Sequence, residues 1–154
     1  MGAEGATEGV RRWPVFVGTF EHTLDDKGRL VLPTSFRSRL ADGAFLSQYE
    51  NCLALWSAEE FSGFVGRLME KLRSKEVAPS AVRVLTANAA EVKPDSAGRV
   101  TIPPRLRAYG GLSTEIVLTG ALDHIELWAP PRWQSVSAEG DEGLAHAVAT
   151  LGIF

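Results

Sequence analysis

The stretch that decides the fold reads DDKGRLVLPTSFR at residues 25–37, and it returns 70 positions later as DSAGRVTIPPRLR at residues 95–107. Asp, Gly, Arg, Pro and a final Arg coincide in the two stretches, and apolar residues recur at the positions between them. Average residue usage would give about one identity by chance in a window of this length. The coincidence indicates that one supersecondary unit has been used twice in tandem.

The repeat extends on both sides of this motif. Glu21 matches Glu91 at the same offset, whereas Leu55-Trp56 matches Leu127-Trp128 at an offset of 72. A gain or loss of two residues suits a turn better than the interior of a helix or strand. Each unit has roughly four dozen residues, which is too few to bury much apolar surface alone. We therefore expect the two copies to complete one shared core.

Apolar periodicity predicts short strands and separate helices, and we expect an α+β fold. A capping box at Ser57 precedes a 3.6-residue apolar period, which predicts a helix over 59–73. Pro33, Pro79, Pro104 and Pro130 suit the first turns of further helices. A last helical stretch over 144–151 could pack on the body or on a neighbouring subunit. The expected strands are 16–17, 20–24, 29–32, 44–49, 52–56, 91–92, 99–102, 115–118 and 124–128.

The composition is ordinary for a globular protein, with 154 residues, 45% apolar and 23% charged. No apolar run approaches the ~18 residues of a membrane span, and the first twelve residues lack the apolar centre of a signal peptide. We therefore expect a cytoplasmic protein without membrane contact. Cys52 is the only cysteine and lies beside Leu53 and Leu55, so a buried, non-catalytic thiol is predicted.

The net charge of −3 taken alone argues against a partner that is a nucleic acid, but the charge is unevenly distributed. Each repeated stretch carries a local basic excess inside an acidic chain. The basic residues of the two stretches and their flanks are Lys27, Arg29, Arg37, Arg39, Arg99, Arg105 and Arg107.

Each repeated stretch reads as a turn followed by a strand. A Gly at the end of the turn permits a positive φ, and the Asp that opens it can accept hydrogen bonds from turn amides. Side chains alternate along the strand, so Leu30 and Leu32 lie on one face and Arg29 lies on the other. The Arg of each motif is therefore expected to be displayed.

Two interpretations of the displayed Arg are open. With the further Arg eight positions on, it makes a compact cationic surface suited to bidentate hydrogen bonds with phosphate or guanine edges. Alternatively, each Arg pairs with the Asp of its own turn as surface decoration, a contact that contributes only ~0–1 kcal/mol.

The motif Asp-x-x-Gly-Arg, followed by apolar residues, Pro and an apolar–Arg pair, resembles the swapped-hairpin DNA-binding module of the SpoVT-AbrB class. Two tandem copies, opened by Phe16-Val17-Gly18 and closed by Glu-Leu-Trp at 126–128, resemble the MraZ family of bacterial regulators. The likeness covers nearly everything from Phe16 to Trp133. It implies two AbrB-like units that form an intrachain pseudo-dimer, with a small β-barrel-like core and peripheral helices.

The resemblance implies a sequence-specific DNA-binding transcriptional regulator, a repressor, of the bacterial division and cell-wall gene cluster. Its subunits would close into a ring homo-oligomer that binds direct repeats of double-stranded DNA in its own promoter, at the nucleoid. The Arg side chains would contact DNA, while Asp and Gly shape the loop. The residues expected at DNA are Asp25, Lys27, Gly28, Arg29, Arg37, Asp95, Gly98, Arg99 and Arg107.

The copies are unequal, because Ala97 stands where the first copy has Lys27, so we expect the second copy to bind phosphate less strongly. The expected organisation is an N-terminal extension at 1–15, a first unit at 16–63, connecting helices at 64–87, a second unit at 88–134, and a C-terminal helix or tail at 135–154.

Other functions have less support in the sequence. His22, His124 and His146 have no Cys or acidic partner at the spacing of zinc ligands, so no metal is predicted. We also expect no cofactor, no small-molecule substrate and no enzymatic activity, because no catalytic motif is present. Trp residues beside Leu are expected to be structural. The main alternative is an antitoxin-like or scaffold module of the same fold that binds a protein partner.

Overall fold

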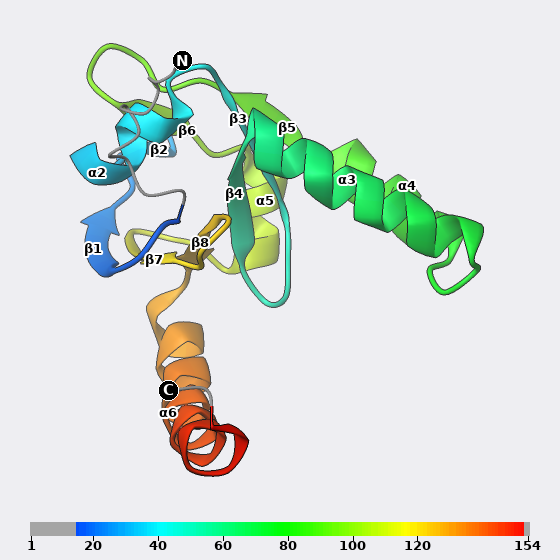
Figure 1. Ribbon diagram of the computed structural model, residues 1–154. Helices are drawn as coiled ribbons and strands as arrows, with labels where there is room; N and C mark the ends of the chain where they lie inside the picture. Colours follow the sequence, from blue (N-terminus) through cyan, green and yellow to red (C-terminus); the bar gives the residue numbers. More distant parts are fainter. Residues whose placement is uncertain (1–14, 153–154) are drawn as a thin grey trace, which may run out of the picture.

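The computed structural model describes residues 15–152, so the expected N-terminal extension lies almost wholly outside the described residues. The strands come in consecutive pairs that are separated by helices, and every strand pair is antiparallel, as in an α+β fold (Figure 1). The strands are β1 (Thr19–Thr23), β2 (Arg29–Val31), β3 (Ala44–Gln48), β4 (Leu53–Ser57), β5 (Ala90–Val92), β6 (Arg99–Thr101), β7 (Glu115–Gly120) and β8 (Ile125–Trp128). The helices are α2 (Thr34–Arg37), the 3₁₀ turn η2 (Ser38–Leu40), α3 (Ala58–Arg73), α4 (Pro79–Asn88), α5 (Pro104–Gly110) and α6 (Pro130–Leu151).

The strands form two antiparallel sheets in which the two copies of the repeat are interleaved. The larger sheet has the order β1-β7-β8-β4-β3-β5, and the smaller one pairs β2 with β6. First-copy β1 therefore pairs with second-copy β7, and second-copy β5 pairs with first-copy β3. If each strand is replaced by its equivalent in the other copy (β1 by β5, β3 by β7, β4 by β8, and the reverse), the order of the larger sheet is the same read backwards. The same strands therefore remain neighbours. The sheet thus has an internal two-fold pattern.

One apolar core serves both copies, as the repeat predicts. Equivalent positions contribute equally: Leu30 and Val100 are buried, as are Leu32 and Ile102. Phe36 packs edge-on against the ring of Phe16, with ring centroids 5.3 Å apart. The alternation of buried and exposed residues along β2 is repeated along β6. Neither copy closes this core without the other.

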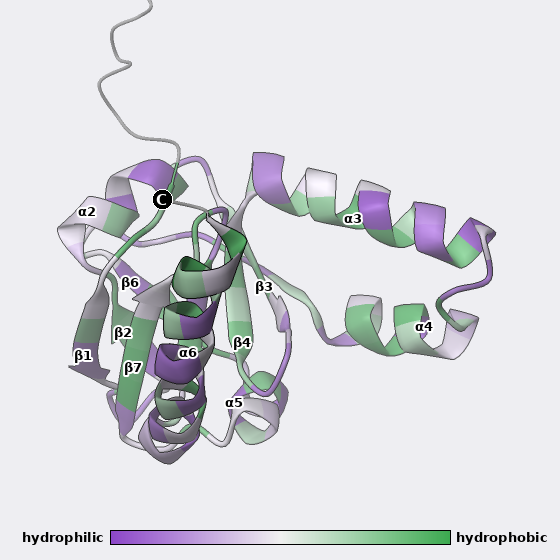
Figure 2. Ribbon diagram, turned by 60° about the horizontal axis from the view of Figure 1, so that its bottom comes forward, coloured by the Kyte–Doolittle hydropathy of each residue, from purple (hydrophilic) through white to green (hydrophobic). Residues whose placement is uncertain are grey.

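The helices begin where the sequence predicts them to begin. The Ser57 side chain accepts a hydrogen bond from the Glu60 amide at 3.2 Å and so caps α3. Pro lies in the first turn of α4, α5 and α6. Helices α3 and α4 project from the sheets as a hairpin, while α6 leaves the body in another direction (Figures 1 and 2). Within residues 15–152, no helix is both long and apolar enough to cross a membrane.

Two expectations from the sequence need correction. The helical stretch expected at 144–151 is the end of one continuous helix that starts at Pro130, because the residues between them stay helical despite Gly140 and Gly143. The strand expected at 16–17 is a single bridge between Phe16 and Leu122.

Candidate nucleic-acid interface

The two motif strands pair with each other and form a short antiparallel ribbon. Arg29 lies opposite Thr101, and Val31 lies opposite Arg99. Because side chains alternate along a strand, these four residues share the outer face of the ribbon. The middle pair, Leu30 and Val100, points inward and is buried. The ribbon therefore presents one Arg from each copy on the same surface.

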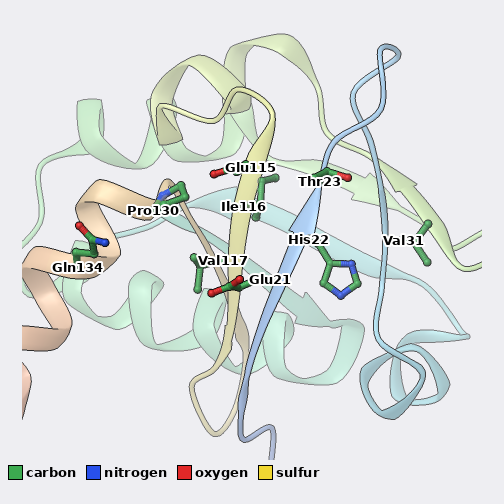
Figure 3. Close-up of a pocket in the computed structure, with 9 residues that line it drawn as sticks. All are labelled: Glu21, His22, Thr23, Val31, Glu115, Ile116, Val117, Pro130 and Gln134. Carbon is green, nitrogen blue, oxygen red and sulfur yellow. The ribbon is translucent and has the colours of Figure 1, made fainter.

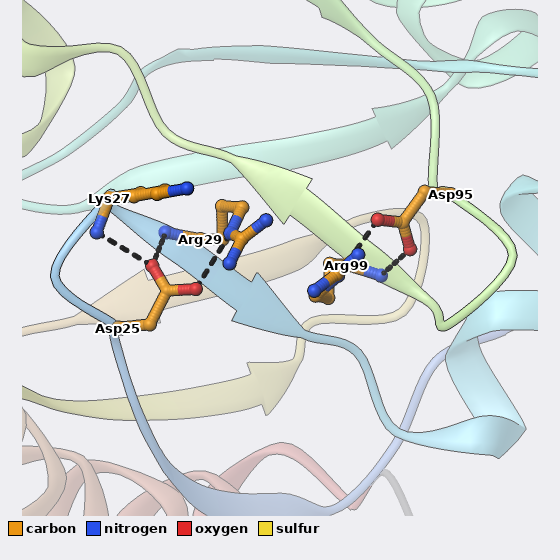
Figure 4. Close-up of polar contacts among 5 residues, drawn as sticks. All are labelled: Asp25, Lys27, Arg29, Asp95 and Arg99. Atoms are coloured by element: carbon orange, nitrogen blue, oxygen red, sulfur yellow. Dashed lines mark hydrogen bonds and ion pairs between the residues drawn. The ribbon is translucent and has the colours of Figure 1, made fainter.

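The turn before β2 is organised by the carboxylate of Asp25. Its Oδ1 accepts hydrogen bonds from the Lys27 amide at 2.9 Å and from the Arg29 amide at 2.8 Å. Its Oδ2 lies 2.7 Å from Nε of Arg29 (Figure 4). The turn is completed by Gly28, whose φ of +75° is accessible to Gly with little strain. One carboxylate thus fixes both the backbone of the loop and the direction of its Arg.

The second copy repeats this geometry. Asp95 accepts a hydrogen bond from the amide of Ala97 at 2.9 Å. It also accepts one from the amide of Arg99 at 2.9 Å, and its Oδ2 lies 2.8 Å from Nε of Arg99 (Figure 4). Gly98 has a φ of +80°. The hydrogen bond from the Arg backbone amide is the largest cause of a lowered pKa at Asp25 and at Asp95, and the guanidinium contact lowers the pKa further. Both carboxylates are therefore charged at neutral pH.

The contact between each Arg and the Asp of its own turn, which the second interpretation predicts, is present in both copies. It does not use all the hydrogen-bond donors of the Arg side chain. The ion pair engages Nε, and among residues 15–152 no hydrogen bond is made by the Nη atoms of Arg29 or Arg99. About a third of each Arg side chain is exposed, 29% for Arg29 and 38% for Arg99. An Arg oriented in this way keeps its terminal donors for an acceptor outside the protein.

Arg37 and Arg107, which are expected at DNA from the sequence, lie against the turns of the two copies. Arg37 donates to the carbonyl of Leu32 at 2.9 Å, and its guanidinium lies against Gly98 of the other copy. In the same way, the guanidinium of Arg107 lies against Gly28, where a Cβ would meet Nη1 at 2.7 Å. Nε of both Arg residues is buried without a partner among the described residues. Each second Arg thus supports the turn of the opposite copy.

Backbone hydrogen bonds reinforce this exchange. The amide of Leu32 donates to the carbonyl of Gly98 at 2.9 Å, and the amide of Ile102 donates to the carbonyl of Gly28 at 2.9 Å. The other basic residue near the first motif, Arg39, donates to the carbonyl of Val15, and its guanidinium lies 3.8 Å from the centroid of the Phe16 ring. The two turns are therefore held by the opposite copy as well as by their own Asp.

Sequence reasoning missed a polar cluster around His124. Its Nδ1 lies 2.7 Å from Oδ1 of Asp123, and its Nε2 lies 2.8 Å from Oε2 of Glu126. Only the spacing of zinc ligands was considered in the sequence, so these two carboxylate partners of His124 were not identified there. Burial lowers the pKa of His124, but the two carboxylates outweigh burial and raise the pKa above its ordinary value. The ring also stacks on Trp56 at 4.6 Å between centroids.

A hollow of about 630 Å³ lies beside β1, β7 and the start of α6. It is lined by Glu21, His22 and Glu115, among others (Figure 3). Glu21 and His22 lie on opposite sides of β1, so the hollow does not bring this carboxylate and imidazole together (Figure 3). Among residues 15–152, no three His, Cys, Asp or Glu side chains are grouped so that they could hold a metal ion.

Together, these observations define the class: an internally duplicated α+β protein built around a pair of Asp–Arg turns on one ribbon. The family model described as "MraZ protein, putative antitoxin-like" matches residues 15–83 and again residues 85–152. The chain belongs to the MraZ family.

Individual relatives agree with the family match. The "Transcriptional regulator MraZ" of Kocuria rhizophila is 40% identical over 126 residues, which cover 81% of this chain and 88% of that protein. The protein of the same name from Nocardioides sp. is 41% identical over 146 residues, covering 85% and 96% respectively. A third, from Acetivibrio thermocellus, is 34% identical over 143 residues, covering 90% of this chain and all of the relative.

Proposed function

We propose that this protein is a sequence-specific DNA-binding transcriptional regulator that reads DNA with the β2–β6 ribbon. The observation that carries the proposal is the pair of Asp–Arg turns, which present Arg29 and Arg99 on one exposed face. The relatives are named transcriptional regulators, which supports the same function for this chain.

The geometry suits the major groove of DNA. The groove admits a two-stranded β-ribbon, and the two terminal nitrogens of an Arg side chain can donate hydrogen bonds to O6 and N7 of guanine. Residues placed diagonally across an antiparallel pair, as Arg29 and Arg99 are, lie about 7–8 Å apart. Lys27 adds a charge for phosphate in the first copy, whereas Ala97 does not in the second. In this proposal Arg37, Arg107, Gly28 and Gly98 contribute to DNA binding indirectly, because they shape the turns that carry Arg29 and Arg99.

We infer from the internal two-fold pattern that the chain is an intrachain pseudo-dimer of swapped hairpins of the SpoVT-AbrB type, around a small barrel-like core. The interleaved strand order supports this inference, because each copy donates strands that complete the sheet of the other.

We further propose that subunits close into a ring that binds direct repeats in the protein's own promoter. The protein would act there as a repressor of the division and cell-wall gene cluster, in the cytoplasm at the nucleoid. Joining subunits in a ring would raise the affinity of this acidic chain for DNA although its basic patches are small. Several modest contacts on joined subunits act at high effective concentration. Binding of this kind weakens as salt rises, because counterions are released from phosphate.

The test is fluorescence anisotropy of the full chain on its own upstream duplex and on a scrambled duplex, at two salt concentrations. Each bidentate Arg–guanine contact contributes about 1–3 kcal/mol, so Arg29→Ala with Arg99→Ala is expected to weaken binding to the native duplex at least about 30-fold. The matched control is Arg29→Lys with Arg99→Lys, which keeps the charge and loses the planar fork. It is expected to keep salt-dependent binding and to lose the preference for the native duplex. Equal affinity of the native protein for both duplexes would refute the proposal.

A second function is favoured by one observation, since the matching family model is described as antitoxin-like. In that case the same fold would mainly hold a protein partner, and a small toxin gene would lie beside its own. The expected results would be weak binding to both duplexes and a stable complex with the product of that neighbouring gene on co-expression.

A further inference from the structure

The outer face of the β2–β6 ribbon has four corners, and only two of them are Arg. Arg29 lies opposite Thr101 and Val31 lies opposite Arg99, so the two Arg residues occupy one diagonal. Val31 and Thr101 occupy the other diagonal, and both are exposed, Val31 to 42%. Val31 also borders the hollow beside β1, so open space adjoins its side chain (Figure 3). Each corner that is not an Arg therefore has an Arg directly across the ribbon.

One end of this face is formed by Val31 and the second turn. The amide of Leu32 donates to the carbonyl of Gly98 at 2.9 Å, which holds the end of β2 against that turn. Arg99 follows directly after the turn and lies opposite Val31. Ala97, inside the turn, is exposed and adds another methyl group. This end therefore presents one guanidinium beside apolar groups.

The other end has an equivalent Arg but polar and charged neighbours. Thr101 lies opposite Arg29. The first turn contributes two exposed charged residues, Asp26 and Lys27, of which Lys27 is drawn in Figure 4. The hydroxyl of Thr101 can donate or accept a hydrogen bond, whereas the side chain of Val31 can do neither. The internal two-fold pattern is therefore broken on the face that carries both Arg residues.

An exposed valine beside a guanidinium offers only an apolar contact to a ligand. Strand propensity alone does not require Val, because Thr101 meets the same preference at the equivalent position of the other copy. Among the base edges of the major groove, the apolar feature is the 5-methyl group of thymine, while guanine offers the acceptors O6 and N7. A methyl group of thymine is therefore the base-edge partner that suits Val31.

The spacing of the corners suits two neighbouring bases. Side chains that lie directly opposite each other in an antiparallel pair are about 4.5–5.5 Å apart. This distance corresponds to about one to two base steps of about 3.4 Å. When Arg99 binds a guanine, Val31 consequently lies over a base that is close to that guanine.

We propose that Val31 contacts the 5-methyl group of a thymine within about two base pairs of the guanine bound by Arg99, and so gives the β2–β6 ribbon a direction on DNA. The inference rests on the proposed function, in which this ribbon lies in the major groove. Two Arg residues related by a two-fold pattern accept a site in either orientation. A methyl contact at one end favours one orientation, as head-to-tail repeats of a site require.

Anisotropy on duplexes that lack single methyl groups tests this contact in the full-length protein. Each thymine of the upstream duplex is replaced in turn by deoxyuridine, which differs only by the missing 5-methyl group. We expect the native chain to bind about 4-fold more weakly when the contacted thymine is replaced, the effect of one buried methyl group. Val31→Ser should bind the unmodified duplex at least about 4-fold more weakly and lose nothing further on that replacement. Val17→Ser, at a valine that is 63% exposed outside the ribbon, is the matched control and should behave like the native chain.

A parallel scan with 7-deazaguanine, which lacks the N7 acceptor, locates Arg99 on the same duplex. The guanine whose replacement weakens binding of the native chain but not of Arg99→Ala is the guanine that this Arg binds. The methyl-sensitive thymine should lie within about two base pairs of it. A methyl-sensitive thymine beside the guanine of Arg29 overturns the proposal, as does equal sensitivity of the native chain and Val31→Ser at every thymine.

An exchange of the two corners keeps the proposal testable if Val31→Ser fails to fold. Val31→Thr with Thr101→Val keeps a β-branched side chain at both positions and leaves the composition of the ribbon unchanged. The methyl-sensitive thymine should then move to the end of the site where Arg29 binds. A thymine that stays in place overturns the proposal.

This proposal and the proposed function fail in different ways. If the native chain prefers its upstream duplex but tolerates every deoxyuridine, the methyl contact is refuted and the proposed function stands. If the native chain binds the upstream and scrambled duplexes equally, both are refuted, because the ribbon then reads no base.

Discussion

Gly98 is the position where one added methyl group tests the contact between the two copies. A Cβ there would fall among the atoms of the Arg37 guanidinium, 2.7 Å from Nη2, and the φ of +80° is strained for any residue with a side chain. The left-handed conformation costs about 1–2 kcal/mol for Ala. Displacement of Arg37 also breaks its hydrogen bond to the carbonyl of Leu32, which contributes about 1 kcal/mol net. Gly98→Ala is therefore expected to lower the free energy of unfolding by about 2–3 kcal/mol.

A double-mutant cycle separates the strain from the displaced guanidinium. In an Arg37→Ala background, Gly98→Ala should cost only the backbone strain, so the two substitutions should couple by about 1 kcal/mol. The control is Gly43→Ala, where φ is +112° and a Cβ meets nothing within 4 Å of the described residues. Its cost should be additive with that of Arg37→Ala. Urea unfolding followed by circular dichroism measures all four states of each cycle. An additive Gly98–Arg37 cycle would refute the idea that Arg37 supports the opposite turn.

Three further predictions concern other parts of the molecule. The pKa of His124 is raised in the folded state, so its protonation stabilises the protein fully below the unfolded pKa of ~6.5, and this contribution is lost as pH rises through the folded pKa. In thermal melts across pH 5–9, His124→Gln should therefore lose less melting temperature above neutrality than the native chain does. Burial raises the pKa of the Cys52 thiol well above its ordinary value, so a thiol reagent at pH 7.5 should modify it only after unfolding. Ser57→Ala removes the N-cap of α3 and should cost about 0.5–2 kcal/mol in urea unfolding, whereas an unchanged midpoint would show that the cap is not stabilising.

The sequence predicts the local structure of this chain well because that structure depends on near neighbours. The Asp25 and Asp95 turns, the capping box at Ser57 and the Pro residues that begin helices each act over a few positions. The apolar positions Leu30 and Val100 likewise alternate with their exposed neighbours in both copies. All of these are features that a periodic pattern or a turn motif records directly.

Side-chain contacts that form only in the folded structure could not be predicted from the sequence in the same way. Arg37 and Arg107 sit at equivalent positions after each motif, but only the pairing of β2 with β6 brings each guanidinium to the opposite turn. His124 lies in the bend before β8, and its ring nitrogens contact the carboxylates of Asp123 and Glu126 through a side-chain geometry that no sequence pattern records. The direct role of Arg29 and Arg99 at DNA stays a prediction for the anisotropy experiment.

The interleaving of the two copies also has a consequence for synthesis of the chain. Strand β1 leaves the ribosome long before its partner β7, so the first copy remains an incomplete sheet with exposed edges until nearly the whole chain has been made. Exposed strand edges bind other strands, and another nascent chain carries the same missing partners. Two chains translated from one message can therefore exchange halves, giving a domain-swapped dimer with the same strand pairs as the monomer. Slow translation between the two copies would favour this exchange, whereas rapid delivery of the second copy favours the closed single chain.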